Sequence, residues 1–241
     1  MNIINQLLQF WFESHWLIAF FMSSLVNIMV YVFTAHILSK VIVYIVQTRQ
    51  HGEYIDRRLL KDNQIKTEFK NGVVACVVFA GGSLASRELF VGFFPDSFMS
   101  LLFQVLGFIV FYESYSYLVH RLMHLKFLSK YHYVHHKSVR VTPWSSYSVH
   151  YIEAFFIGIS APIFMLLLPL SLSVALVLHI LGMMFTILLH CNLNYTANNV
   201  LLKIFFSYPS FHSKHHAYGN VNYGFVNKVW DSWFSTLYKK A

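Results

Sequence analysis

Histidine is the residue type with the clearest chemical potential in this chain. Fourteen histidines stand beside only ten acidic residues, and eleven of them lie between residues 120 and 216. Eight fall into three motifs: His120-x-x-x-His124, His132-x-x-His135-His136 and His212-x-x-His215-His216. Residues at i, i+3 and i+4 share a helix face, so each motif directs two or three imidazoles the same way. A solvated face is usually built from Lys and Glu instead. The spacing therefore predicts helices that bind metal ions.

The number of histidines indicates more than one metal. Eight motif histidines exceed the four ligands of one tetrahedral zinc, and His190, which the topology below brings to the same face, makes nine. Nine ligands suit two metals, each with four or five imidazoles and an open position. Imidazole binds zinc, copper, nickel and iron, so the ligand type alone does not name the ion. The predicted ligands are His120, His124, His132, His135, His136, His190, His212, His215 and His216.

The composition indicates which elements must position these side chains. Of the 241 residues 56% are hydrophobic and only 12% are charged, whereas soluble domains carry about 25% charged residues. Such a chain cannot cover its apolar surface with a polar shell, so a bilayer is its expected solvent. Cys76 and Cys191 lack CxxC spacing, which favours packing over a disulfide or a thiolate site. The basic residues, with a net charge of +8, form no single stripe, so no nucleic-acid partner is expected.

Five apolar stretches are candidates for membrane helices. The second is interrupted by Gly81-Gly82 and by Arg87-Glu88, which suggests a broken or re-entrant helix, and Pro169-Leu170-Ser171 joins the last two as a tight hairpin. The first sixteen residues lack Lys and Arg, so no cleavable signal peptide is expected. The stretches are 17–46, 73–94, 98–119, 152–168 and 172–189.

Lysine and arginine predict the orientation of these helices. Six lie between residues 47 and 71, five between 120 and 150 and five after 190; with Lys40 this places 17 of 18 on one side, leaving only Arg87. Because cytosolic loops are enriched in Lys and Arg, the N-terminus is expected outside and the histidines at the cytosolic face. The predicted fold is an all-α polytopic membrane bundle of about four to five spans with a histidine-rich metal-binding cap. Residues 1–97 would form the N-terminal helices and basic loop, and 98–241 the histidine-box domain.

The three histidine boxes, in this order and spacing, resemble the fatty acid hydroxylase/sterol desaturase superfamily. The resemblance covers roughly residues 100 to 238. Three positions depart from the pattern: Glu113 replaces the usual Asp, the third box reads H-S-K-H-H, and His150-Tyr151 replaces His-Pro. No box histidine is missing. Further matches are Tyr117 with His120-Arg121, Ser138, Pro143-Trp144-Ser145, His150-x-x-Glu153, Asn222-Tyr223-Gly224 and Trp230-Asp231.

The resemblance implies two iron ions that use O2 to hydroxylate or desaturate a membrane lipid of sterol or fatty-acyl type. A lipid C–H bond has no acidic proton and no leaving group, so a strongly oxidising metal centre must break it. Zinc can replace iron in overexpressed protein. The residues do not distinguish hydroxylation from desaturation, nor one lipid class from another.

Four further residues are expected to support the metal ligands. Glu113 lies on the face of His120, two turns earlier, and can accept that ring's second N–H; otherwise it is a buried carboxylate with another donor. His150, beside Glu153, is expected to orient a ligand or to begin a helix. Asp231 is expected either to accept a ring N–H or to cap the segment near Trp230.

The resemblance also bears on partners and location. Because the chain has no Rossmann, flavin or haem-binding motif, electrons would come from a separate carrier of the cytochrome b5 or ferredoxin type. The basic loops can bind such a carrier, although the charge rule for cytosolic loops already explains them. The expected location is a bacterial inner membrane or the endoplasmic reticulum.

Two other function classes stay open at this stage. A membrane metal transporter would place histidines along an ion path, but the spans carry few ligands beyond His36, His179 and Glu113. A zinc-dependent membrane hydrolase would need a carboxylate base beside the metal, and no HExxH motif is present.

Overall fold

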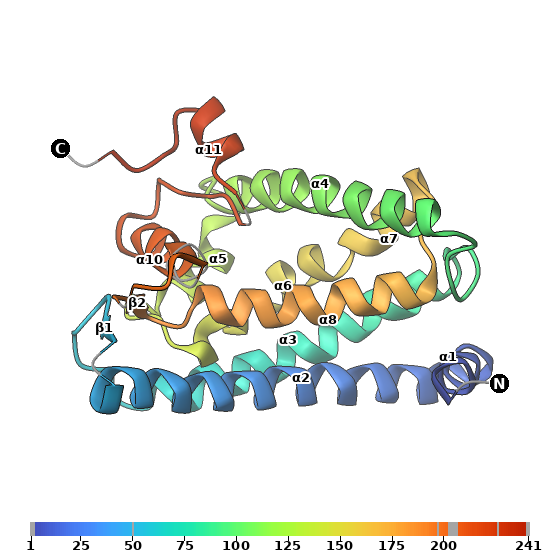
Figure 1. Cartoon of the computed structure of the whole chain (residues 1–241), viewed down its shortest axis with the longest axis horizontal. Helices are drawn as coiled ribbons and strands as arrows, with labels where there is room; N and C mark the ends of the chain where they lie inside the picture. The colour runs from blue at the N-terminus through green and yellow to red at the C-terminus, as the bar shows by residue number, and fades with distance from the viewer. Residues whose placement is uncertain (1–2, 50, 197, 202–206, 226, 240–241) are drawn as a thin grey trace.

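The computed structural model describes residues 3–49, 51–196, 198–201, 207–225 and 227–239. Four helices are long and apolar enough to cross a membrane, and they lie along one common direction (Figure 1). The predicted all-α membrane bundle is therefore confirmed, and the chain is an integral membrane protein. The four helices are α2 (Trp16–Tyr44), α3 (Gln64–Arg87), α4 (Phe98–Met123) and α8 (Leu172–Leu189).

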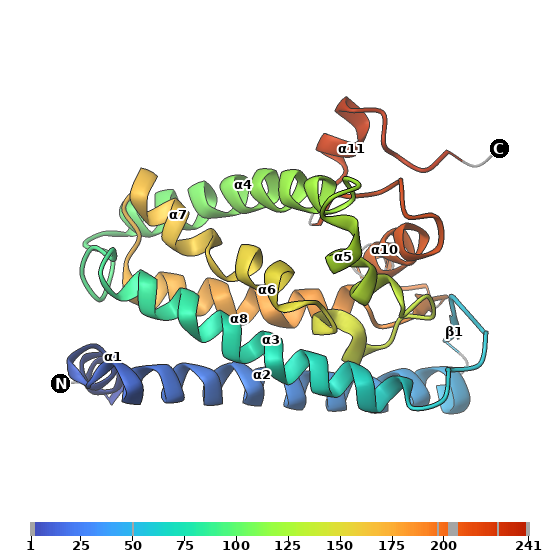
Figure 2. The same ribbon diagram turned by 180° about the vertical axis from the view of Figure 1, so that it is seen from behind.

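Short elements occupy the two ends and the interior of the bundle. Helix α1 (Ile3–Glu13) lies at one end. The opposite end holds α5 (Ser129–His136), α10 (Ser207–Tyr218), α11 (Val229–Trp233) and strands β1 (Gly52–Tyr54) and β2 (Leu193–Tyr195), as Figures 1 and 2 show. The remaining elements are the π-helical turn η1 (Ile45–Arg49), the 3-10 helix η2 (Pro143–Tyr147), α6 (Tyr151–Gly158) and α7 (Ser160–Leu167).

Helix α3 corrects one expectation. The Gly81-Gly82 pair does not break the helix, which runs continuously from Gln64 to Arg87. A Cβ atom on Gly82 would lie 2.1 Å from the carbonyl oxygen of Gly158, so glycine is required here because α3 and α6 approach closely. At the end of α3, the Arg87 guanidinium donates hydrogen bonds to the Phe12 and Ser14 carbonyls and so fastens the end of α1.

The fourth apolar stretch forms two short helices instead of one span. Helix α6 ends at Gly158 and α7 begins at Ser160. Pro162 explains the break, because its ring would clash with the carbonyl four residues earlier and it has no N–H to donate. Residues 169–171 then return the chain into α8, as expected from Pro169.

The main hydrophobic core contains residues from both predicted parts of the chain, 1–97 and 98–241. Tyr31 of α2 and Phe79 of α3 pack with Tyr147 of η2 and Ile187 of α8, and the Tyr31 hydroxyl donates a 2.7 Å hydrogen bond to the Trp144 carbonyl. The division at residue 97 stays a prediction. Cys76 and Cys191 are both buried and free, in keeping with the packing role expected from their spacing.

One small sheet fixes the histidine-bearing end. Strands β1 and β2 pair antiparallel, with Glu53 opposite Asn194. The pairing holds the segment after α2 against the segment after His190. A side chain on Gly52 would meet Leu193 at 2.8 Å, so glycine allows the two strands to approach.

Candidate metal centre

The structure brings all nine predicted ligands together in two groups. Within each group, one potential ligand atom from every histidine lies within 4.8 Å of all the others. We call the five-membered set group 1 and the four-membered set group 2. Group 1 is His120, His124, His132, His136 and His215, and group 2 is His135, His190, His212 and His216.

Four elements deliver these side chains. The end of α4 supplies two histidines to group 1, and the C-cap of α8 supplies His190 to group 2. Helices α5 and α10 each contribute to both groups, because the i, i+4 pair of each HxxHH motif enters one group and the i+3 histidine enters the other. The two motifs therefore hold the groups side by side, and the His136 and His216 ring centroids are 5.0 Å apart.

The Nε2 atoms of group 1 are spaced as ligands of one ion would be. His215 Nε2 lies 3.1 Å from His136 Nε2 and 3.3 Å from His124 Nε2, and His136 Nε2 lies 3.1 Å from His132 Nε2. Two imidazole nitrogens that each lie about 2.0–2.1 Å from a metal are about 2.9–3.4 Å apart at octahedral or tetrahedral angles. The observed spacings fit this range.

Group 2 has the same spacing. His190 Nε2 lies 3.3 Å from His135 Nε2 and 3.0 Å from His212 Nε2, and His216 Nε2 lies 3.1 Å from His212 Nε2. All four histidines are buried. The donor set therefore fits a second ion of the size and ligand preference of a first-row transition metal.

Hydrogen bonds at the other ring nitrogen fix which tautomer several histidines adopt. Carbonyl oxygens lie 2.9 Å from His120 Nδ1, 2.7 Å from His215 Nδ1 and 2.8 Å from His190 Nδ1; they belong to Tyr223, Val221 and Thr186 respectively. A carbonyl only accepts, so each Nδ1 carries the proton and each Nε2 presents a lone pair. Lone pairs that converge at about 3 Å repel one another, and a bound cation removes that repulsion.

The protonation of the histidines favours the same conclusion. Burial, followed by the charges of neighbouring histidines, lowers the pKa of His124 to about 4 and of His136 to about 3. Burial also lowers the pKa of His190 to about 4. The pKa values of His135, His212, His215 and His216 are lowered well below the ordinary value for the same reasons. These rings are neutral at pH 7, which is the form that binds a metal.

Glu153 lies where an orienting carboxylate is expected. Its Oε1 atom is 2.9 Å from His132 Nδ1, and both side chains are buried. The carboxylate fixes the His132 ring and directs its Nε2 into group 1. His150 caps α6 by accepting a 3.2 Å hydrogen bond from the Ile152 N–H at its Nδ1, and it belongs to neither histidine group.

Of the two alternatives for Glu113, the structure shows the second, a buried carboxylate with donors other than His120. It is buried, and its Oε1 accepts hydrogen bonds from the backbone N–H groups of Phe225 (3.3 Å) and Asn227 (3.1 Å). The Nδ1 of His120 faces the Tyr223 carbonyl instead. Glu113 thus anchors the segment that follows Tyr223.

Asp231 holds the same segment from its other side. Its carboxylate accepts from the backbone N–H groups of Tyr223 (2.8 Å) and Gly224 (2.6 Å) and from the Thr236 hydroxyl (2.7 Å). A Cβ atom on Gly224 would lie 2.4 Å from the Asn227 carbonyl, which explains the glycine of the Asn-Tyr-Gly motif. Asp231 therefore acts on His120 through the Tyr223 carbonyl.

Sequence reasoning missed Glu68. This carboxylate of α3 is 1% exposed and accepts hydrogen bonds from Ser138 (2.7 Å), Thr142 (2.6 Å) and Gln64 (2.7 Å). It fastens the loop that follows the second histidine motif. Glu68 precedes the apolar stretch predicted at 73–94 and lies among the basic residues 47–71, so neither hydropathy nor a motif marked it; only the observed extent of α3, from Gln64 to Arg87, places it inside a helix.

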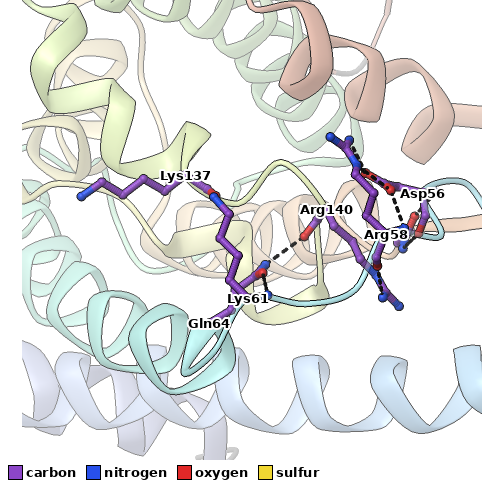
Figure 3. Close-up of polar contacts among 7 residues, drawn as sticks. Asp56, Arg58, Lys61, Gln64, Lys137 and Arg140 are labelled. Carbon is purple, nitrogen blue, oxygen red and sulfur yellow. Dashed lines mark hydrogen bonds and ion pairs between the residues drawn. The ribbon is translucent and has the colours of Figure 1, made fainter.

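Further hydrogen bonds from Lys61 and Gln64 hold that loop. Lys61 donates a 3.2 Å hydrogen bond to the Lys137 carbonyl, and Gln64 donates a 3.0 Å hydrogen bond to the Arg140 carbonyl (Figure 3). Arg140 in turn donates to the Arg58 carbonyl, and Arg58 pairs with Asp56 (Figure 3). These contacts attach the segment before α3 to the segment after α5, and so restrain the position of α5.

A cavity of about 90 Å³, here called the metal cavity, adjoins both groups. His120 and His132 of group 1 and His135, His190 and His212 of group 2 line it. Its other walls are mainly apolar and aromatic side chains, including Tyr112, Tyr147 and Ile157. The site therefore exposes its histidines to a small, water-poor space suited to a hydrocarbon.

Comparison with known proteins identifies the family. The family described as fatty acid hydroxylase matches residues 105–236. The chain belongs to the fatty acid hydroxylase family. All nine grouped histidines lie within the matched residues, as do Glu113, His150, Glu153 and Asp231. The resemblance to the fatty acid hydroxylase/sterol desaturase superfamily is confirmed.

Several curated proteins resemble this fatty acid hydroxylase family member. The Delta(7)-sterol 5(6)-desaturase of Saccharomyces cerevisiae is 28% identical over 231 residues, which is 91% of this chain and 59% of the yeast protein. That of Candida dubliniensis is 30% identical over 135 residues, 56% of this chain and 34% of the relative. Lathosterol oxidase of Mus musculus is 28% identical over 142 residues, 58% of this chain and 47% of the relative.

The chain thus spans between about a third and three fifths of the length of these relatives. No solved structure matches it.

Proposed function

We propose that this chain is an O2-dependent oxidoreductase that hydroxylates or desaturates a membrane lipid at a centre of two iron ions. Group 1 would hold one ion and group 2 the other, with the nine histidines as ligands. The observation that carries the proposal is the convergence of Nε2 atoms in two adjacent groups beside an apolar cavity. Bound iron would supply the oxidising power to break an unactivated C–H bond.

The residues of the chain would bind, orient and shield. Glu153 fixes the His132 ring, and the carbonyls of Thr186 and Val221 keep the protons of His190 and His215 at Nδ1. Each of these three histidines then presents an unprotonated Nε2 to a metal. The apolar walls of the metal cavity exclude water, so that an oxidising centre reacts with the lipid and not with solvent.

A lipid substrate is the proposal that best fits the surroundings. The metal cavity lies within a bundle whose outer surface is apolar, so a hydrocarbon can enter from the bilayer. The printed names of the relatives refer to sterol desaturation and lathosterol oxidation, which supports a sterol or similar lipid. Neither the metal cavity nor the names of the relatives supports a metal transporter or a zinc hydrolase in this way.

We also propose an orientation and an electron donor. Basic side chains at the histidine-bearing end, including Arg58, Lys61, Lys137 and Arg140, favour the cytosol for that end. The same charges suit an acidic carrier of the cytochrome b5 or ferredoxin type. The membrane would be the bacterial inner membrane or the endoplasmic reticulum.

Metal analysis tests the proposal directly. The purified protein should contain about two irons per chain, and a His135→Ala/His136→Ala variant, which removes one ligand from each group, should lose most of both. A His36→Ala variant is the control, because this exposed histidine of α2 belongs to neither group.

The outcomes separate the candidate functions. Iron-dependent O2 consumption together with two irons supports the oxygenase. A single zinc, or no metal after anaerobic reconstitution with ferrous iron, contradicts it and supports a hydrolase or a transporter. If the purified protein contains two zinc ions, they are exchanged for iron and O2 consumption is measured. If the iron-loaded protein consumes no O2 in the presence of reductant and lipid, the proposal is wrong.

A further inference from the structure

Two more cavities lie among the membrane helices and share lining residues with the metal cavity or with each other. A middle cavity of about 80 Å³ shares Tyr112, Tyr147 and Ile157 with the metal cavity. An end cavity of about 320 Å³ shares Phe79 and His179, among others, with the middle cavity. The shared lining residues make the three cavities neighbours, in the order metal cavity, middle cavity and end cavity.

The end cavity is lined by residues of α1, α2, α3, α7 and α8, among others. Helix α1 lies at the end of the bundle opposite the histidine-bearing elements (Figures 1 and 2). Most of the cavity's lining is apolar, with Leu8 and Trp11 contributed by α1. Its serines are already engaged: Ser23 accepts from the Trp11 indole N–H, and Ser83 and Ser86 donate to carbonyls of their own helix. His179 is the histidine that lines this mainly apolar cavity, and the hydrogen bonds of the serines do not explain its presence there.

A relay of hydrogen bonds fixes the state of His179. The Asn27 amide nitrogen donates to the Cys76 carbonyl (3.1 Å), so the Asn27 amide oxygen is the atom that faces His179 Nε2 at 2.9 Å. Nε2 must therefore carry the ring proton, and Nδ1 must present a lone pair. Among the residues that the structure describes, His179 Nδ1 has no hydrogen-bond partner, and the ring lines both the middle and the end cavity.

We propose that His179 Nδ1 accepts a hydrogen bond from the hydroxyl group of a lipid alcohol held in these cavities. A neutral imidazole whose tautomer is fixed by Asn27 offers an acceptor and no second donor. It therefore selects a lipid that donates, such as a long-chain alcohol. A fatty-acid carboxylate and an ester carbonyl only accept, so they gain nothing from this nitrogen.

The position of His179 also says which end of the lipid would meet the metal. His179 and His190 are eleven residues apart on α8 and its cap, which is about 16 Å at the rise of an α-helix. A lipid bound at His179 by its hydroxyl would reach the histidine groups with its opposite end. Binding of a lipid alcohol at His179 does not depend on the proposed function. Only the identification of that alcohol as the substrate rests on the proposed function.

The test is a binding measurement without turnover. The full-length protein in phosphatidylcholine nanodiscs is kept anaerobic and without reductant, and radiolabelled 1-octadecanol is displaced by unlabelled 1-octadecanol or by 1-methoxyoctadecane, which lacks the O–H. The wild type should prefer the alcohol about three- to tenfold, the contribution of one hydrogen bond. Comparing each variant with the wild type cancels the different partitioning of the two probes into the bilayer.

Three variants separate recognition from folding. His179→Phe keeps a flat ring but removes the acceptor, so the preference for the alcohol should disappear while affinity for the ether is unchanged. His179→Gln, which can donate to Asn27 and still offer a carbonyl oxygen, should retain part of the preference. His36→Phe makes the same substitution at an exposed histidine of α2 that lines none of the three cavities, and should retain all of it.

Equal binding of alcohol and ether by the wild type, or an undiminished preference in His179→Phe, overturns the proposal. If His179→Phe does not fold, His179→Gln decides the question: a preference for the alcohol smaller than that of the wild type supports the proposal, and an undiminished preference contradicts it. Failure of the protein to bind iron would remove the proposed function but leave this binding result standing.

Discussion

Groups 1 and 2 use the same ligand type but hold it in different ways. In group 1, hydrogen bonds at Nδ1 orient His120, His132 and His215. In group 2, only His190 has such a bond, and the buried Nδ1 atoms of His135, His212 and His216 have no hydrogen-bond partner among the described residues. Group 1 is thus positioned by a polar network, whereas burial and packing position most of group 2. Similar metal sites can therefore depend on different parts of the protein.

Removing one ligand from each group should produce the largest effects. His124→Ala should reduce bound iron from about two per chain toward one by emptying group 1, and His190→Ala should do the same for group 2. Activity should fall at least about a hundredfold in both, since the proposed reaction needs both ions. Elemental analysis with O2 uptake checks this. Loss of both ions in either variant would show that the groups do not bind independently.

Removing the orienting carboxylate should affect group 1 alone. Glu153→Gln takes away the charge that holds His132, and such partners typically contribute about 10–100-fold to metal affinity. Competition with a chelator should then release one iron earlier than the other. Glu53→Gln, at an exposed glutamate of β1, is the matched control. Equal weakening of both ions would contradict the distinction between the groups.

A more distant change should have a smaller effect on the same group. Asp231→Asn weakens the hold on the Tyr223 backbone and, through its carbonyl, on His120. We expect a loss of about tenfold or less in the affinity of group 1, because the contact is indirect. The same chelator competition measures it. A larger loss than that of Glu153→Gln would show that His120 matters more than His132.

Acid should destabilise the metal-free protein by a few degrees. The folded pKa values of His124 and His190 are about 4 and that of His136 is about 3, below the unfolded value of about 6.5. Between these values the unfolded chain binds protons that the folded chain does not. The free energy of unfolding should therefore be fully retained above about pH 6.5 and decrease as the pH falls toward 3.

Melting temperatures of the metal-free protein between pH 7.5 and 4.5 check this dependence. His190→Leu, which removes one buried titrating ring, should give a shallower decrease. A melting temperature that does not change over this range would mean that the rings bind protons equally in the folded and unfolded states, which contradicts the lowered pKa values.

The role of the histidines as metal ligands was easier to predict from the sequence than the contacts that surround them. The spacing of the histidines indicated helices that bind metal, and hydropathy located α2, α4 and α8 to within a few residues. The sequence could not indicate that each HxxHH motif serves two groups, because that depends on where a neighbouring helix lies. The carbonyls of Thr186, Val221 and Tyr223 have no signature, since every residue has a carbonyl.

Glycine and proline in an apolar stretch did not show by themselves whether the helix breaks there. The Gly81-Gly82 pair suggested a broken helix, but Gly82 allows α6 to approach a continuous α3. Pro162 did divide the apolar stretch at 152–168, which the sequence had indicated as a single candidate membrane helix. A glycine in a helix pattern marks either flexibility or close packing, and only the partner helix decides between them.

The distribution of ligands along the chain also sets an order of assembly. Each group combines histidines from α4 and α5, or from α5 and α8, with histidines from α10. Group 1 cannot be complete until the ribosome has synthesised His215, nor group 2 until it has synthesised His216, and α10 must then reach the other ligands. A nascent chain that has already inserted its four long helices would still lack both sites. Metal loading is then a late step in biogenesis, and an ion bound there would join early and late parts of the chain and report that synthesis has passed α10.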